Sequence, residues 1–165
     1  MRFTPQTQKI LLSAAHIARD FGHGYVGSAH LLMAMARQPD CTGDLLRWAG
    51  VEPDRAAQMA GLLYGTGTPG LPLPQGYSGQ MRRILRDAGR EADYQKDSRV
   101  EPVHMLLSLL RQDSTAAKEL LILSGVDTET LFTRTVETLR YQREMANKQK
   151  EAVTTKLLEQ FSEDL

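Results

Sequence analysis

The sequence predicts an all-α protein built from two copies of one helical unit. Apolar residues recur at helical spacing along most of the chain, as at Ile10, Ala14 and Ile17. No stretch alternates apolar and polar residues between hairpin turns. The third observation is a repeat, because His30 and the apolar run after it are answered by His104 and a similar run, 74 residues later.

The repeat extends well beyond the two histidines. Matching residues keep the offset of 74 along the first helix and up to the second, and an inserted residue then changes the offset to 75. The matched pairs are Phe3 and Tyr77, Thr4 and Ser78, Ile10 and Ile84, Ala14 and Ala88, Ala18 and Ala92, Val26 and Val100, Leu45 and Leu120, and Gly50 and Gly125. Two copies of such length indicate a tandem duplication rather than a stacked solenoid.

Two amphipathic helices open the first unit. Thr4 is expected to cap the first helix with its hydroxyl, with Pro5 at the first helical position, and the helix should end near Gly22. The second helix is expected from about Ser28, its predicted cap, to Arg37. Little of its surface is polar, so it should be the buried centre of its unit.

Two further helices complete the first unit. The third should start at Asp40–Thr42 and stop at Gly50, a favourable residue just after a helix end. The fourth should open at Glu52–Asp54, and its residues expected to face inward are Ala56, Met59, Ala60 and Leu63. Repeated Gly and Pro over residues 65–76 then predict a linker.

The second unit repeats the plan, with helices expected over residues 78–94, 101–111, 114–123 and 128–139. Residues 141–155 are rich in Gln, Lys, Glu and Ala, which predicts a solvated helix or a mobile connector. A short apolar patch follows at Leu157, Leu158, Phe161 and Leu165. The predicted organisation is a first repeat at 1–64, a linker at 65–76, a second repeat at 77–140 and a connector at 141–165.

Composition limits the classes of function. The 165 residues contain 20 basic and 20 acidic side chains, so no overall field attracts nucleic acid or an anionic membrane surface. The single cysteine excludes an intrachain disulfide and zinc sites built on several thiolates. No apolar run has a signal-peptide pattern or the length of a membrane span, so we expect a cytoplasmic setting.

These residues resemble the duplicated N-terminal domain of Clp-type AAA+ unfoldases, most closely the ClpC and ClpA group. The resemblance covers about residues 1–140 and rests on Phe3–Thr4, the run from Gly22 to Leu32, the Gly50–Val51 turn and their second-copy counterparts. The segment from Leu157 to Leu165 also looks like the lead into the first ATPase module of those enzymes.

The resemblance implies eight helices in two four-helix repeats, related by a pseudo-twofold axis. It also implies a domain that captures substrates or adaptor proteins for a hexameric ATPase and, through the hexamer, for a Clp peptidase. No phosphate-binding Gly-x-x-x-x-Gly-Lys motif occurs, so we expect no ATP hydrolysis and no cofactor in this chain, with ATP and Mg²⁺ confined to the missing ATPase modules.

One departure concerns the ligand. Family members that read phosphoarginine have a glutamate before the histidine of each repeat, whereas this sequence has Ala29 and Val103. The accompanying helix-start hydroxyls remain as Thr4 and Ser78. Neither an alanine nor a valine side chain accepts a hydrogen bond from a guanidinium group, so we expect these four positions to bind an apolar segment or an adaptor instead of phosphoarginine.

The histidines and Cys41 have functional and structural interpretations. His30 and His104 suggest a metal site or a proton switch, but a ring that bridges a loop and a helix by hydrogen bonding is the favoured account. His16, His23 and His30 are spaced seven residues apart, but glycines interrupt the helix between them, which argues against a metal site. Cys41 has no accompanying nucleophile motif, and we expect it to be a small packing residue.

An arginine stripe and the methionines also allow two interpretations. One side of a helix carries Arg82, Arg86 and Arg90, which suit either an acidic partner or a solvated face. The solvated face is the favoured account, with its charge neutralised by the nearby acids Asp87, Glu91 and Asp93. The methionines suit either an adaptable groove or, as favoured, the core.

Three functional hypotheses follow. The favoured one is the substrate- or adaptor-docking domain of a ClpC/ClpA-like unfoldase. The alternative is a free-standing accessory protein of the same fold that docks onto a Clp complex. The third is a small helical enzyme using Cys41 or the histidines.

Overall fold

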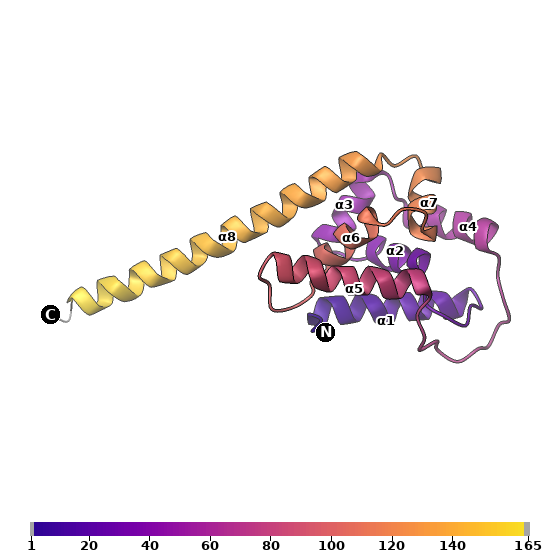
Figure 1. The fold of residues 1–165 in the computed structure, drawn as a ribbon, viewed down its shortest axis with the longest axis horizontal. Helices are drawn as coiled ribbons and strands as arrows, with labels where there is room; N and C mark the ends of the chain where they lie inside the picture. Colours follow the sequence, from indigo (N-terminus) through magenta and orange to yellow (C-terminus); the bar gives the residue numbers. More distant parts are fainter. Residues whose placement is uncertain (1, 164–165) are drawn as a thin grey trace. The chain divides into compact units, whose positions relative to one another are not determined.

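The computed structural model describes the backbone of residues 2–163 and the side chains of residues 2–160 (Figure 1). Eight α-helices follow one another in this part of the chain, and the all-α prediction is confirmed. They are α1 (Pro5–Asp20), α2 (Ser28–Ala36), α3 (Cys41–Ala49) and α4 (Pro53–Tyr64), then α5 (Gly79–Tyr94), α6 (Pro102–Arg111), α7 (Ala116–Leu123) and α8 (Thr128–Glu163).

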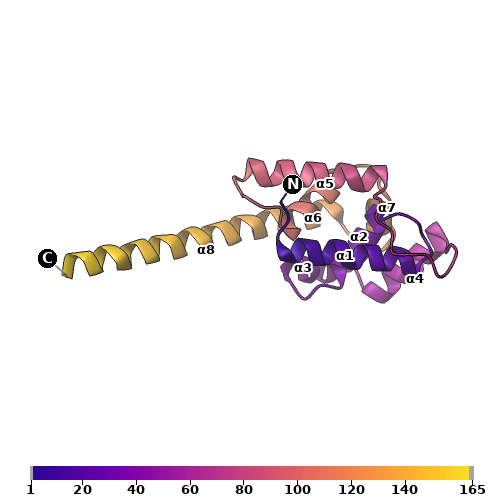
Figure 2. The same ribbon diagram turned by 90° about the horizontal axis from the view of Figure 1, so that it is seen from below.

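The first helices of the two copies begin in the same way. The hydroxyl of Thr4 accepts a hydrogen bond from the backbone N–H of Thr7 at 3.2 Å, and that of Ser78 accepts one from Met81 at 3.1 Å. Each bond satisfies one of the backbone donors that a helix start leaves without an intrahelical partner. The two helices run antiparallel (Figures 1 and 2), which is the arrangement that a twofold axis perpendicular to them produces.

Helix contacts between the copies come in matched pairs. The contact of α1 with α6 has its counterpart in that of α5 with α2, and the contact of α2 with α7 has its counterpart in that of α6 with α3. Exchanging the two copies therefore converts each contact of these two pairs into the other of its pair, whereas the contact of α4 with α7 lies outside them. This pattern is the signature of a pseudo-twofold axis between the repeats.

The core is shared by the two copies. The helices α2 and α6 lie at its centre, and every residue of α2 is buried. Residues matched in the sequence repeat are buried in both copies, as Ile10 and Ile84 are, each with no exposed surface. One contiguous apolar cluster contains residues of both copies. Each copy therefore contributes half of a single core, and neither half could bury its apolar face alone.

Three local expectations were wrong. Ser28 is the first residue of α2 and not its cap, which is Gly27. The helix α7 begins at Ala116 with Thr115 as its cap, because Ser114 has a left-handed φ of 59°. Leu63, expected to face inward, is 39% exposed, whereas the next residue, Tyr64, is packed against the core.

The chain divides into two compact units, Met1–Thr135 and Val136–Leu165. The helix α8 begins in the first unit and continues through the second as far as Glu163. Of the two interpretations of residues 141–155, the solvated helix agrees with the structure, since side chains 144–160 are exposed. In the predicted apolar patch Leu157 and Leu158 are exposed, whereas Leu165 and the side chain of Phe161 lie outside the described residues.

Candidate binding site between the two repeats

Two short backbone bridges join the copies where their helices start. Val26 pairs with Tyr77, and Phe3 pairs with Val100, both in parallel register. Adding the repeat offset of 74 to Phe3 and Val26 gives Tyr77 and Val100, so one bridge is the counterpart of the other. Each bridge brings the start of a second helix from one copy beside the start of a first helix from the other.

The four helix-start positions predicted as a site therefore form two crossed pairs. Ala29 at the start of α2 and Ser78 before α5 line one cavity together. Their counterparts are Val103 at the start of α6 and Thr4 before α1, where the N–H of Thr4 donates to the carbonyl of Val100 at 3.1 Å. Both Ala29 and Val103 are buried, at 5% and 2% exposure.

The cavity beside Ala29 and Ser78 has a volume of about 530 Å³, within the range of ligand-binding pockets. Its lining is mostly apolar and aromatic and comes from both copies: Phe21, Tyr25, Ala29, Met33, Ala60 and Tyr64 from the first, and Ser78, Gly79, Gln80, Arg83 and Ala116 from the second, with His23 and His30 on one side. We call it the inter-repeat cavity. Of the described residues that line it, Arg83 alone carries a permanent charge.

Polar side chains hold the walls of the inter-repeat cavity together. Ser28 donates to the side-chain oxygen of Gln80 at 3.0 Å and accepts from the N–H of Ala117 at 3.0 Å, and the same oxygen of Gln80 accepts from Ala116 at 3.1 Å. These bonds satisfy the first two N–H groups of α7, that of Ala116 through Gln80 of the same copy and that of Ala117 through Ser28 of the other copy. The cavity is therefore built on fixed helix ends and not on a loose loop.

Tyr64 closes another side of the inter-repeat cavity. Its hydroxyl donates to the carbonyl of Ala116 at 2.9 Å and to the carboxylate of Glu119 at 3.3 Å. Burial first, and then the charge and the hydrogen bond of Glu119, raise the pKa of Tyr64 to about 12. The phenol therefore stays protonated and tied to α7 at neutral pH, which joins α4 of the first copy to the second copy.

A chain of histidines forms the third side of the cavity. His30 accepts at Nδ1 from the N–H of Gly27 at 2.9 Å, so its proton must lie on Nε2, which is 2.9 Å from Nδ1 of His23. Nδ1 of His23 is then an acceptor, and its Nε2–H donates to the carbonyl of Gly65 at 3.0 Å. Burial, and next the neighbouring His23, lower the pKa of His30 to about 4. Both rings are neutral in this arrangement.

The second copy retains half of this arrangement. His104 accepts at Nδ1 from the N–H of Glu101 at 2.9 Å, and its Nε2–H donates to Asp97 at 2.9 Å. Asp97 occupies the position that His23 has in the first copy. Both repeat histidines therefore bridge a loop and a helix, as the structural interpretation predicted. Among the described residues, no group of three or more His, Cys, Asp or Glu side chains is arranged to hold a metal ion.

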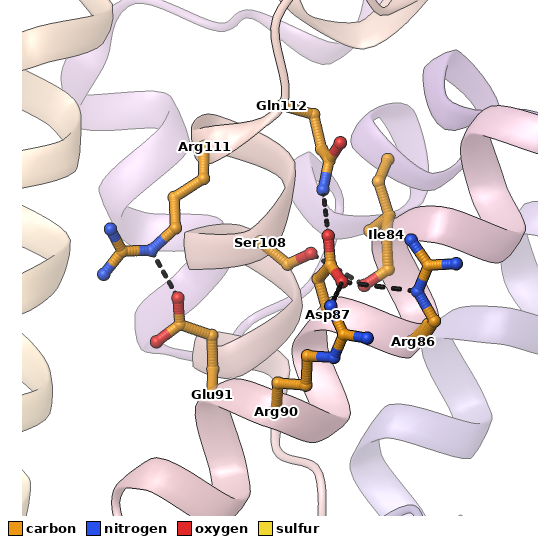
Figure 3. A network of polar contacts seen from close by, with 8 residues as sticks. All are labelled: Ile84, Arg86, Asp87, Arg90, Glu91, Ser108, Arg111 and Gln112. Atoms are coloured by element: carbon orange, nitrogen blue, oxygen red, sulfur yellow. Dashed lines mark hydrogen bonds and ion pairs between the residues drawn. The ribbon is translucent and has the colours of Figure 1, made fainter.

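The predicted arginine stripe is divided between several partners (Figure 3). Arg86 and Arg90 both lie by Asp87, at 3.5 and 3.2 Å. Glu91, expected to neutralise the stripe, instead pairs with Arg111 of α6. Arg82 is exposed on α5 and makes no side-chain hydrogen bond or ion pair with the described residues.

Two other sequence interpretations have different outcomes. Cys41 was expected to pack inside, but it is exposed at the first position of α3, where its side chain points away from the core. Most methionines are in the core as favoured, including Met35, Met81 and Met105, which have no exposed surface. Met33 is also buried, and it lines the inter-repeat cavity as well.

Sequence reasoning missed several cavity residues. Phe21, Tyr64 and Gln80 carry no motif, and Tyr25 was noted only as part of the run from Gly22 to Leu32. These residues line one cavity where a backbone bridge joins the copies. A signal was nevertheless present. Gln80 matches Gln6 at the repeat offset, and Gln6 likewise reaches the start of a third helix, with its amide 3.2 Å from the cap residue Asp40.

Residues 2–68 and 76–163 match the family model described as the Clp repeat (R) N-terminal domain. A "Probable ATP-dependent Clp protease ATP-binding subunit" from Chlamydia pneumoniae is 26% identical over 73% of this chain, and the match covers 14% of that relative. The chain therefore corresponds to about a seventh of the length of that protein.

Two solved structures have the same fold. The N-terminal domain of the chaperone ClpD from Arabidopsis thaliana has a TM-score of 0.70, with 20% identity over 84% of this chain and 97% of that domain. The Hsp104 N-terminal domain from Candida albicans has a TM-score of 0.67, with 24% identity over 84% of this chain and 91% of that domain. Among the described residues, no helix has the length and apolar character needed to cross a membrane.

Proposed function

Because the chain belongs to the family of Clp repeat (R) N-terminal domains, we propose that it is a protein-binding module that recruits substrates or adaptor proteins for a Clp ATPase. The observation that carries this proposal is the inter-repeat cavity of about 530 Å³ with its apolar and aromatic lining. Such a surface suits an apolar side chain of an extended polypeptide segment. ATP hydrolysis and delivery to a peptidase belong to ATPase modules outside this chain.

The chemistry of the cavity favours an apolar anchor over phosphoarginine. Ala29 offers a methyl group where a guanidinium would need a carboxylate, and His30 already uses both ring nitrogens. The hydroxyl of Ser78 is engaged as a helix cap. Arg83 adds a positive charge at the lining, which repels a guanidinium and attracts an acidic residue beside the anchor.

The proposal is tested by adding bulk to the lining. Gly79 lines the cavity, and no atom lies within 4 Å of a Cβ built there, so Gly79→Leu narrows the space without a clash. Gly76→Leu is the matched control, since its Cβ position is equally open and Gly76 does not line the cavity. Binding of a fluorescent peptide with one central Phe in a Gly/Ser background is measured by anisotropy.

We expect saturable binding that weakens about tenfold in Gly79→Leu and stays unchanged in Gly76→Leu, because about tenfold is the cost of excluding one apolar side chain. The same peptide with Asn instead of Phe, and free phosphoarginine, should show no saturable binding. Equal binding by both variants, or tight binding of phosphoarginine, would refute the proposed site.

A further inference from the structure

A second cavity of about 330 Å³ lies at the other end of α5, on the side of the Phe3–Val100 bridge. Four arginines line it: Arg2 before α1, Arg86 and Arg90 on α5, and Arg99 in the loop that leads to α6. We call this hollow the arginine cavity. Three separate chain segments therefore place guanidinium groups around one hollow.

The positive charges of the arginine cavity are only partly neutralised. Arg86 and Arg90 share the one carboxylate of Asp87. The guanidinium groups of Arg2 and Arg99 make no hydrogen bond or ion pair with any residue that the structure describes. Two aspartates also line the cavity, Asp93 and Asp97, against its four arginines. Asp97 already accepts the Nε2–H of His104 at 2.9 Å, so part of its capacity is used inside the protein.

The loop that carries Asp97 and Arg99 differs in chemistry from its counterpart in the first copy. At the repeat offset of 74, Arg99 takes the place of Tyr25, and Asp97 takes the place of His23. Tyr25 and His23 line the inter-repeat cavity. The same loop therefore carries aromatic rings in the first copy and charged groups in the second. These two loop positions therefore differ in chemistry between the copies, and both line a cavity.

We infer that the arginine cavity is a docking site for an acidic segment of a partner polypeptide. Carboxylates are the complementary groups, because the planar guanidinium forms paired hydrogen bonds with them. The four arginines lie close together while the whole chain carries no net charge, so attraction is local to this cavity. A nucleic acid would instead need an extended positive surface along its backbone.

The test uses a fluorescent peptide of about ten residues that are mostly glutamate, followed by anisotropy at low and at high salt. The double variant Arg2→Ala/Arg99→Ala removes the two guanidinium groups that have no partner in the described structure, and so leaves no acidic partner unpaired. The matched control is Arg37→Ala/Arg82→Ala, which removes the same charge at two exposed positions that do not line the cavity. A single-stranded oligonucleotide of similar charge is the competing ligand.

We expect the cavity variant to weaken peptide binding about tenfold at low salt, and the control variant to weaken it less than about twofold. Binding should fall as salt is raised, and the oligonucleotide should bind more weakly than the peptide. Equal losses in the two variants, no peptide binding at low salt, or preferred binding of the oligonucleotide would overturn the inference. The Phe-anchored peptide should be unaffected by Arg2→Ala/Arg99→Ala, so this test is independent of the inter-repeat cavity.

Discussion

Replacing His30 by glutamine is expected to remove a pH-dependent part of the free energy of unfolding. The pKa of His30 is lowered from 6.5 to about 4, first by burial and then by the electrostatic effect of the neighbouring His23. The unfolded chain therefore binds a proton between these pH values that the folded chain does not, and stability falls as the pH decreases through this window. The difference corresponds to about 3 kcal/mol in full, and to about 2 kcal/mol between neutral pH and pH of about 5.

The hydrogen-bond geometry explains why the folded protein resists this proton. Nδ1 of His30 faces the N–H of Gly27, and its Nε2–H faces His23. A proton added at Nδ1 would point at another donor, and a proton added to Nδ1 of His23 would face the Nε2–H of His30. The chain from Gly27 to the carbonyl of Gly65 therefore breaks at whichever ring is protonated.

The assay is urea unfolding at several pH values from neutral to about 5, together with an NMR titration of the imidazole signals. His16→Gln is the matched control, because His16 is exposed and its hydrogen-bond partner is the side chain of Arg19 on the same helix. Asp127 also has a lowered pKa, chiefly through its hydrogen bond with Thr130, but its effect begins only below its ordinary value of 3.8 and is common to all variants. Equal pH dependence in wild type and His30→Gln, or titration of His30 at 6.5 or above, would refute the reasoning.

Three further predictions concern the backbone and the core. Lys96→Gly should raise the free energy of unfolding by about 1 kcal/mol, because Lys96 has a left-handed φ of 59° at the position that Gly22 occupies in the first copy; no gain in thermal or urea denaturation would contradict this. Gly67→Ala should lower the free energy of unfolding by about 3 kcal/mol, because the added Cβ would lie 2.1 Å from the carbonyl oxygen of Gly22. An unchanged urea midpoint would show that the linker moves freely there. Ser108→Ala should lower the free energy of unfolding by about 1 kcal/mol, because it removes the buried hydrogen bond from the Ser108 hydroxyl to the carbonyl of Ile84 at 2.7 Å (Figure 3). A neutral effect in the same assay would contradict the assigned hydrogen bond.

Much of the fold could be predicted because its signals are local or repeated. Caps such as Thr4 and Asp40 act within three residues, and the glycine after α3, Gly50, has the left-handed φ of 113° that the helix end uses. The matched residues of the two copies identified the buried face of each helix. Propensity and periodicity suffice where the stabilising partner lies in the same helix or in its repeat.

The site could be predicted only in part, because its partners are distant in the sequence. Ser28 looked like a helix cap, but its hydroxyl bonds to Gln80 and to the N–H of Ala117, which are 52 and 89 residues away. Cys41 was interpreted as a small packing residue because it is a lone thiol at a helix start with no accompanying nucleophile motif. Its exposure depends on how α3 rotates against the core, and one apolar period does not determine that rotation.

The two copies show why backbone symmetry and binding chemistry are separable. The crossed bridges depend on backbone N–H and carbonyl groups, which every residue at these positions supplies, so both survive sequence divergence. The cavities beside them depend on side chains, and the exchange of Tyr25 for Arg99 alters a lining without altering a bridge. A duplicated scaffold of this kind can therefore change the ligand of one copy while the shared core, and with it the stability of the other copy, is preserved.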